Sequence, residues 1–110
     1  IGYLSGKYRD NQIPKNSRIG LFGDFWTRYK EDNAKKAVDD YYKLAKENGL
    51  TLTQMSLAFV NSRPFMTSNI IGATTMEQLK ENIGTADIEL SDEIIAKINL
   101  IHSNNPNPTP

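Results

Sequence analysis

A glycine and small hydroxyl residues stand before a charged helix in the stretch IGATTMEQLKEN, residues 71–82. Gly72 closes a short apolar run, and Thr75 and Gln78 have the spacing of a capping box that opens a helix. The free N–H groups of a helix start, with a neighbouring hydroxyl such as that of Thr74, suit an anion. The stretch therefore predicts either an anion site or a capping box alone, and the residue types by themselves favour the capping box.

Glu81 and Asn82 follow Gln78 by three and four residues. Helical spacing puts these three side chains on neighbouring faces near the helix start. A carboxylate beside an amide is suited to the polar edge of an adenine-like ring. The alternative interpretation is that both residues are solvated surface.

Two basic residues stand in loop-like sequence nearer the start of the chain. Lys7, in SGKY, suits a phosphate as a point charge, although the spacing of a Walker loop is missing. Arg18, in IPKNSR, suits a phosphate or a stacked ring. An exposed surface cation is the simpler interpretation of each. His102 is the only histidine and cysteine is absent, so the sequence predicts no metal site.

The composition excludes several classes of function. The 13 basic and 13 acidic residues cancel, whereas nucleic acid or an anionic membrane surface favours a basic excess. No apolar run approaches the roughly 20 residues that cross a bilayer. The lack of cysteine fits a reducing compartment, and we expect a cytoplasmic protein.

Apolar periodicity predicts helices over residues 34–48, from Thr51 to before Pro64, after Thr75 and after Ser91. Residues 1–33 are expected to be irregular and the tail polar. The residues expected to face inward are Ala34, Ala37, Val38, Tyr41, Ala45, Leu52, Met55, Ala58, Phe59, Met76, Leu79, Ile83, Ile94, Ile95, Ile98 and Ile101.

One strand is predicted, at residues 68–71, ending at Gly72. A lone strand cannot satisfy its own backbone groups, so its neighbours must lie elsewhere. Two helices, a strand and a further helix form a unit of a parallel α/β sheet. We therefore expect one incomplete domain.

Three blocks resemble the C-terminal part of aldo-keto reductases, especially the bacterial-type and potassium-channel β-subunit branches. They are GYLSGKY, GLTLTQMSLAFVNSRP and IIGATTMEQLKENIGTADIELSDE, in family order. The resemblance implies the C-terminal part of a (β/α)8 TIM barrel, an α/β fold that is mostly helical when taken alone, with one clear strand. Residues 1–33 would form the end of strand seven and a long cofactor and substrate loop. Residues 34–90 would hold helices, strand eight and the next helix, and residues 91–110 the last helix and tail.

The resemblance also implies bound NADP(H) without a Rossmann domain. Thr74 and Gln78 would lie near the 2′-phosphate and Glu81 and Asn82 on adenine. Other family members carry lysine and arginine at the positions of Gly72 and Gln78, so the preference for NADPH would rest on Arg18 and the helix start. The implied cofactor residues are Gly2, Lys7, Arg18, Gly72, Ala73, Thr74, Gln78, Glu81 and Asn82, with Leu4 and Ser5 at neighbouring positions; Phe22, Phe25 and Trp26 would line the substrate pocket.

The family's catalytic aspartate, tyrosine, lysine and histidine belong to the first half of the barrel, outside this chain. Tyr41 and Tyr42 have helix-core spacing and are not assigned as the acid. The expectation is the C-terminal segment of a reductase of aldehydes and ketones, inactive alone, whose partners are the rest of the barrel and a small carbonyl substrate.

Two other functions stay open on the sequence. The first is a non-enzymatic, redox-sensing cofactor-binding subunit of the channel β-subunit type. The second is a helix–turn–helix DNA-binding module over residues 34–62, which the zero net charge disfavours.

Overall fold

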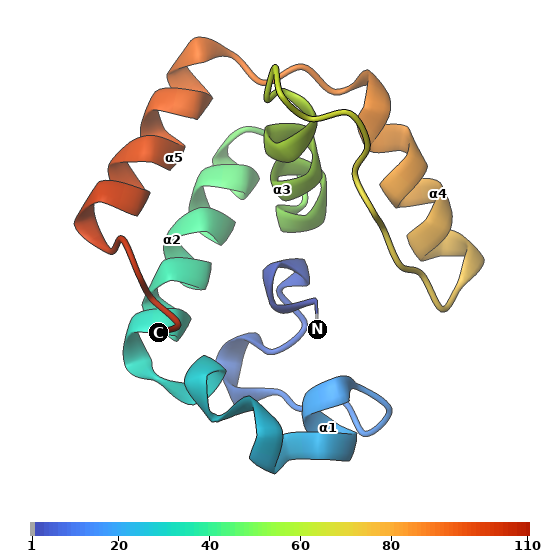
Figure 1. Ribbon diagram of the computed structural model, residues 1–110, viewed down its shortest axis with the longest axis vertical. Helices are drawn as coiled ribbons and strands as arrows, with labels where there is room; N and C mark the ends of the chain where they lie inside the picture. The colour runs from blue at the N-terminus through green and yellow to red at the C-terminus, as the bar shows by residue number, and fades with distance from the viewer. Residues whose placement is uncertain (1) are drawn as a thin grey trace.

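Helices α2, Asp32–Glu47, and α3, Leu52–Asn61, form the centre of the computed structural model, which describes residues 2–110. Between them, the Asn48 N–H donates to the Ala45 carbonyl oxygen and the Gly49 N–H to the Lys46 carbonyl oxygen. Gly49 has a φ of 69°, a conformation that favours glycine. The predicted stop at Asn48 and Gly49 is therefore confirmed. Helix α5, Asp92–Asn104, packs on α2, and helix α4, Met76–Gly84, packs on α3 (Figure 1).

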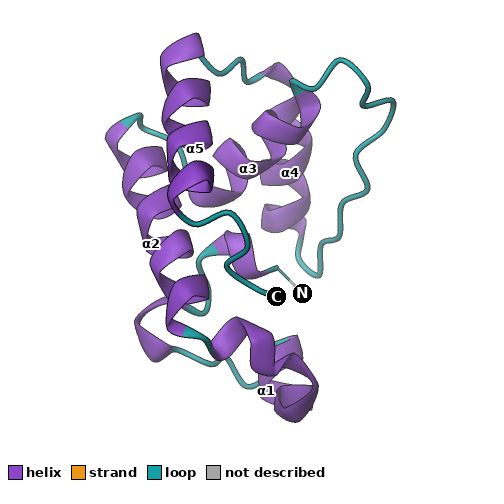
Figure 2. Cartoon of the chain, turned by 60° about the vertical axis from the view of Figure 1, so that its left-hand side comes forward, coloured by secondary structure: helices purple, strands orange, loops and turns teal. Residues whose placement is uncertain are grey.

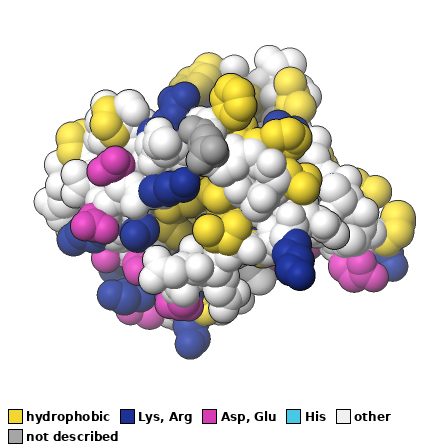
Figure 3. Space-filling view, turned by 90° about the horizontal axis from the view of Figure 1, so that it is seen from below, with side chains coloured by type: hydrophobic (Ala, Val, Ile, Leu, Met, Phe, Trp, Pro, Cys, Tyr) yellow, Lys and Arg dark blue, Asp and Glu magenta, His cyan; other side chains and the backbone are white. Residues whose placement is uncertain are grey.

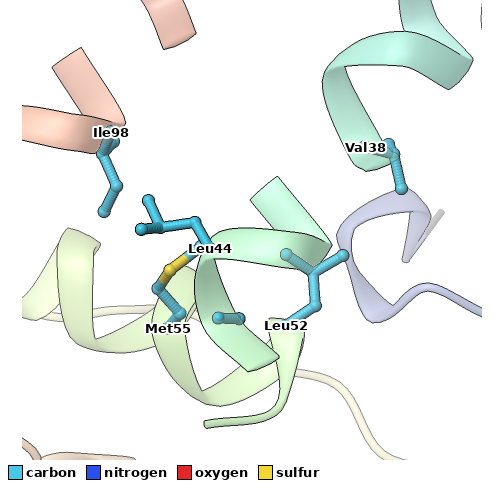
Figure 4. Packing of buried hydrophobic residues seen from close by; sticks show 6 residues of the cluster. Val38, Leu44, Leu52, Met55 and Ile98 are labelled. Atoms are coloured by element: carbon cyan, nitrogen blue, oxygen red, sulfur yellow. The ribbon is translucent and has the colours of Figure 1, made fainter. Parts of the chain in front are cut away.

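The core lies where α2, α3 and α5 meet (Figure 4). Met55 on α3 is 2 % exposed and lies against a cluster from all three helices. Most of the residues of α2 and α3 that were expected to be buried are buried. Tyr41 and Phe59 are only partly buried. Leu44 is also part of the core, although the sequence pattern did not predict it. The buried residues of this cluster are Val38, Leu44, Ala45, Leu52, Met55 and Ile98.

The first thirty residues contain short helices in place of a purely irregular loop. Helix α1, Arg18–Phe22, is capped by Ser17, whose Oγ accepts from the Gly20 N–H at 3.1 Å. A Cβ on Gly20 would lie 2.5 Å from the Pro14 carbonyl oxygen, so this turn needs glycine. Short 3₁₀ helices cover Tyr3–Ser5, Arg9–Asn11, Gly23–Lys30 and, after α4, Thr85–Asp87. The expected end of barrel strand seven begins at position 1, outside the described residues.

Hydrophobic side chains are exposed on the face that carries these short helices. Figure 3 shows them beside Lys and Arg side chains at the end of the molecule where α1 lies. Leu21, Phe22 and Phe25 are all exposed, and Phe25 is 84 % exposed. Phe22 and Phe25 therefore do not pack into the core of the described chain.

The predicted strand at residues 68–71 is not formed, and the described chain contains no strand. Residues 62–75 run as a loop that stands away from the helices (Figure 2), and Ile70 is 96 % exposed. A strand exists only when a neighbour pairs with its N–H and C=O groups, and nothing in the described chain does so. The expectation of one clear strand is therefore wrong for this segment.

The inward face predicted for α4 is also wrong in part. Met76 and Ile83 are 61 % and 60 % exposed, and only Leu79 is partly buried. The pattern identifies an apolar face, but α3 and the 3₁₀ helix Thr85–Asp87 contact a different side of α4. On α5, Ile98 alone is fully buried, with Ile94, Ile95 and Ile101 half-covered.

Each of the last three helices begins at the hydroxyl residue expected from the sequence. Thr51 and Gln54 form a complete capping box, and Ser91 accepts from the Ile94 N–H. Among the helices described, none is long and apolar enough to cross a membrane.

Candidate functional site

A groove of about 480 Å³ lies between the start of the chain and the segment that leads into α4. It brings together residues about seventy positions apart in the sequence, with one face of α3 between them. Its volume and its mixture of apolar and polar groups are typical of small-molecule sites. The lining residues are Gly2, Leu4, Ser5, Lys7, Thr53, Ser56, Leu57, Ile70, Ile71, Gly72, Gln78, Glu81 and Asn82.

The N-terminal wall of the groove is a tight turn that carries Lys7. Gly2 has a φ of 73°, and a Cβ built on it would lie 3.3 Å from Lys7 Nζ. A side chain at this position would therefore be strained and would crowd the ammonium group. Ser5 Oγ donates to the Gly2 carbonyl oxygen at 2.7 Å, which closes the turn. Within the described residues, Lys7 pairs with no carboxylate, so its charge is available to a ligand.

The start of α4 differs in detail from the predicted capping box. Thr75 Oγ1 accepts from the Gln78 N–H at 3.3 Å, as expected. The Gln78 side chain, however, reaches one residue further back, where its Oε1 accepts from the Thr74 N–H at 2.9 Å and the Thr74 hydroxyl at 3.1 Å. Thr74 and Gln78 are therefore joined to each other, and within the described residues no hydrogen bond engages the Gln78 amide nitrogen.

Glu77 places a negative charge at the same helix start, a feature that the sequence analysis missed. Its own backbone N–H and then the Thr75 hydroxyl lower the pKa of the Glu77 carboxyl. The carboxylate thus uses donors of the first turn that an anion would otherwise bind. The acidic residue in the first turn was the available signal.

Glu81 and Asn82 are half-buried and both face the groove. Glu81 Oε1 accepts a hydrogen bond of 2.5 Å from the hydroxyl of Thr51, the residue that caps α3. Asn82 Nδ2 donates to the Gly72 carbonyl oxygen at 3.2 Å. The carboxylate and the amide are therefore held by other elements, which the surface interpretation did not expect.

Helix α3 contributes a wall that the sequence analysis also missed. Thr53, Ser56 and Leu57 have the i, i+3, i+4 spacing of one helix face and line the groove. Ser56 Oγ donates to the Leu52 carbonyl oxygen at 2.7 Å, so its hydroxyl is committed to its own helix. The alternation of these residues with the buried Leu52 and Met55 is the sequence pattern that could have predicted this wall.

Other expected site residues do not line this groove. Ala73 and Thr74 lie beside it, and Arg18 begins α1 with an exposed side chain. Phe22, Phe25 and Trp26 are also absent from its lining. Trp26 is half-buried against Tyr29, with ring centroids 6.2 Å apart. The substrate-pocket assignment thus stays a prediction.

An ion pair anchors the N-terminal turn to α2. Arg9 Nε donates to Asp39 Oδ1 at 2.7 Å, and the guanidinium lies 3.6 Å from the Tyr42 ring centroid. The hydrogen bond to Asp39 is the main cause that raises the pKa of Arg9. Among the described residues, no cluster of three metal-ligating side chains occurs.

Comparison with known proteins gives the family. The model of the Aldo/keto reductase family matches residues 1–102. The chain belongs to this family. Membership implies that the chain is part of a TIM-barrel domain, and it weighs against the helix–turn–helix alternative. Proteins of this family are oxidoreductases that generally use NAD(P)H.

This aldo-keto reductase chain is similar to proteins from distant organisms. It is 43 % identical to "Protein tas" of Escherichia coli over 110 residues, all of this chain and 32 % of that protein. It is 35 % identical to an "Aldo-keto reductase" of Babesia bovis, covering 92 % of this chain and 37 % of that protein. It is 32 % identical to a "Probable voltage-gated potassium channel subunit beta" of Oryza sativa, covering 98 % and 34 %. The chain therefore spans about a third of the length of these relatives.

Proposed function

We propose that this chain supplies the adenosine-phosphate side of the NADP(H) site in a longer aldo-keto reductase that reduces aldehydes and ketones to alcohols. The observation that carries the proposal is the groove that joins Gly2 and Lys7 to Gly72, Gln78 and Glu81. "The full-length protein" here means the polypeptide that carries this chain together with the rest of the barrel. The exposed Ile70 and the unformed strand support this proposed partner.

The chemistry of the groove fits the adenosine half of a dinucleotide. Lys7 offers an ammonium group to a phosphate, and Leu4 and Leu57 offer apolar contact to a ring. The Glu81 carboxylate suits an exocyclic amine. The Gln78 amide nitrogen and Arg18 are the donors proposed for the 2′-phosphate, with the carboxylate of Glu77 opposing them.

The roles of this chain are binding and orientation. A bound reduced nicotinamide supplies a hydride to the carbonyl carbon. The side chains of the groove hold the far end of the cofactor, so its reactive end keeps one position. The proton donor would come from the rest of the barrel, and Phe22, Phe25 and Trp26 are proposed to contribute to the substrate side.

The test is cofactor binding by the full-length protein. Replacing both Glu81 and Asn82 by alanine should weaken NADPH binding by roughly a hundredfold, since each lost polar contact costs about 1.5 kcal/mol. Lys80→Ala, on an exposed position of the same helix, is the matched control and should bind as the wild type does. Equal NADPH affinity of the double variant and the control would contradict the proposal.

A second candidate is a non-enzymatic cofactor-binding subunit that reports redox state to a partner. Its support is the similarity to proteins named as potassium channel β subunits. Steady-state turnover of NADPH with aldehydes by the full-length protein separates the two. NADPH binding with negligible turnover would favour the subunit. The cytoplasmic location expected from the sequence stays a prediction.

A further inference from the structure

We propose that Thr51 is a positioning residue for the adenosine end of the cofactor and that it acts through Glu81; this inference rests on the proposed function. Thr51 is the residue before α3, and it does not line the groove. Its hydroxyl nevertheless donates to Glu81 Oε1, on a different helix and thirty residues later in the chain, at 2.5 Å.

The direction of this hydrogen bond is fixed by the carboxylate, and the capping box holds the Thr51 hydroxyl in place. Thr51 Oγ1 accepts the Gln54 N–H at 3.1 Å, and the Thr51 N–H donates to Gln54 Oε1 at 2.9 Å. A carboxylate oxygen only accepts, so the Thr51 hydroxyl supplies the proton of this bond, while one lone pair of its oxygen accepts the Gln54 N–H. The proton therefore points to Glu81, and the two bonds of the box hold Thr51 in place.

The consequence falls on the geometry of Glu81. One carboxylate oxygen is bound by α3, so the side chain loses rotational freedom before any ligand arrives. The second oxygen is the one left for the groove. A group held by a second layer of hydrogen bonds binds its ligand without the entropic cost of ordering a long side chain.

The arrangement needs a residue at position 51 that both caps a helix and donates a proton. Serine and threonine do both, whereas aspartate and glycine cap a helix but have no hydroxyl proton to donate. The capping role and the positioning role of Thr51 can therefore be separated by substitution.

The experiment measures binding of adenosine 2′,5′-bisphosphate and of nicotinamide mononucleotide to the full-length protein. Thr51→Asp keeps the cap, removes the donor and should raise the dissociation constant of the bisphosphate roughly tenfold or more. The affinity for the mononucleotide, which lacks adenosine, should stay the same. Thr51→Ser should restore bisphosphate binding to within about twofold of the wild type. In turnover, the KM for NADPH should rise in Thr51→Asp while kcat is kept.

Two controls separate positioning from folding. Ser91→Asp makes the same exchange at the start of α5, remote from the groove, and should leave bisphosphate binding unchanged. In a Glu81→Ala background, Thr51→Asp should cause no further loss of affinity, because the partner is already absent. Thr51→Gly, which also caps a helix, replaces Thr51→Asp if the aspartate variant does not fold.

Each result decides between distinct conclusions. Failure of the wild type to bind either NADPH or the bisphosphate would overturn the proposed function and this inference with it. Wild-type binding with an equally tight Thr51→Asp variant would overturn the role of Thr51 alone. An equal loss of affinity with and without Glu81 would show that Thr51 acts only through the stability of α3, which also overturns the inference.

Discussion

The Asn82 side chain donates to the Gly72 carbonyl oxygen across 3.2 Å, so helix α4 holds the loop that precedes it. Ten residues separate the two groups, and the loop between them makes the local bond from Thr74 to Gln78. Asn82 thus commits a donor to the protein backbone and keeps its carbonyl oxygen for the groove. Its effect on ligand binding includes the shape of the loop as well as any direct contact.

Asn82→Ala should loosen this loop. The loss of one hydrogen bond, worth about 1 kcal/mol, should speed backbone amide exchange in residues 72–75 roughly fivefold. Hydrogen exchange measured by mass spectrometry on the ligand-free protein tests this. Glu81→Ala, which removes the neighbouring side chain but not this bond, should leave exchange in the loop unchanged. Equal protection in the wild type and Asn82→Ala would contradict the prediction.

Arg9→Ala should destabilise the fold by about 1–2 kcal/mol, because it removes an ion pair, a contact with the Tyr42 ring and the packing of a partly buried stem. Urea unfolding followed by circular dichroism measures the change. The matched control is Lys36→Ala, which removes an exposed pair with Asp40 on α2 and should cost about 0.3 kcal/mol. Similar losses in the two variants would mean that Arg9 is an ordinary surface cation.

Met55→Ala should destabilise the fold far more than the surface substitution Leu100→Ala. The side chain is 2 % exposed at the meeting of α2, α3 and α5, and its truncation should lower the free energy of unfolding by about 2–5 kcal/mol. Leu100→Ala, at a position 61 % exposed on α5, should change it by less than about 0.5 kcal/mol. Thermal and urea unfolding give both values, and a loss at Leu100 equal to that at Met55 would place the core elsewhere.

Tyr41 gives the protein a pH dependence on the alkaline side. Burial, and then the charge of Asp40, raise the pKa of Tyr41 above its ordinary value of 10.0. The neutral phenol is favoured in the fold, so its contribution to stability is full below about pH 10 and is lost as pH rises through the folded pKa. Tyr41→Phe should therefore reduce the loss of stability as the pH rises above about 10. An unaltered alkaline profile in unfolding experiments would count against this assignment.

The isolated 110 residues should show no reductase activity. The groove contains binding groups, and the resemblance to the family places the proton donor in another part of the barrel. Purified residues 1–110 mixed with NADPH and a panel of aldehydes should give no oxidation above the rate without protein, followed by absorbance. Carbonyl-dependent oxidation of NADPH by this segment would refute the prediction.

The helix starts could be predicted because their causes are local. Thr51, Thr75 and Ser91 each accept from an N–H three residues later, and each is readable from its own neighbourhood. The strand at residues 68–71 failed for the opposite reason, since a strand depends on partners that are distant in sequence. The predicted burial of Met76 and Ile83 was wrong for a related reason. Periodicity identifies the apolar face of a helix, but it does not say which element covers that face.

The site was predictable from the pattern of residues only in part. The spacing of Gln78, Glu81 and Asn82 placed three groups near one helix start, and all three line the groove. Their meeting with Lys7 followed from the family resemblance, since no local rule joins positions so far apart. The contribution of Thr53 on α3 to the groove was not predicted, because polar residues within a helix were assigned no role.

The groove closes a chain loop of about seventy residues, from the turn at Gly2 and Lys7 to the segment at Gly72. Bringing the ends of such a loop together costs on the order of 4 kcal/mol in chain entropy. A dinucleotide that touched both walls, as proposed, would act as a cross-link between them, and at a hundred times its dissociation constant it would stabilise the closed form by about 2.7 kcal/mol. The two figures are similar in size, so a bound cofactor would offset much of the entropy that is lost when this segment closes on itself.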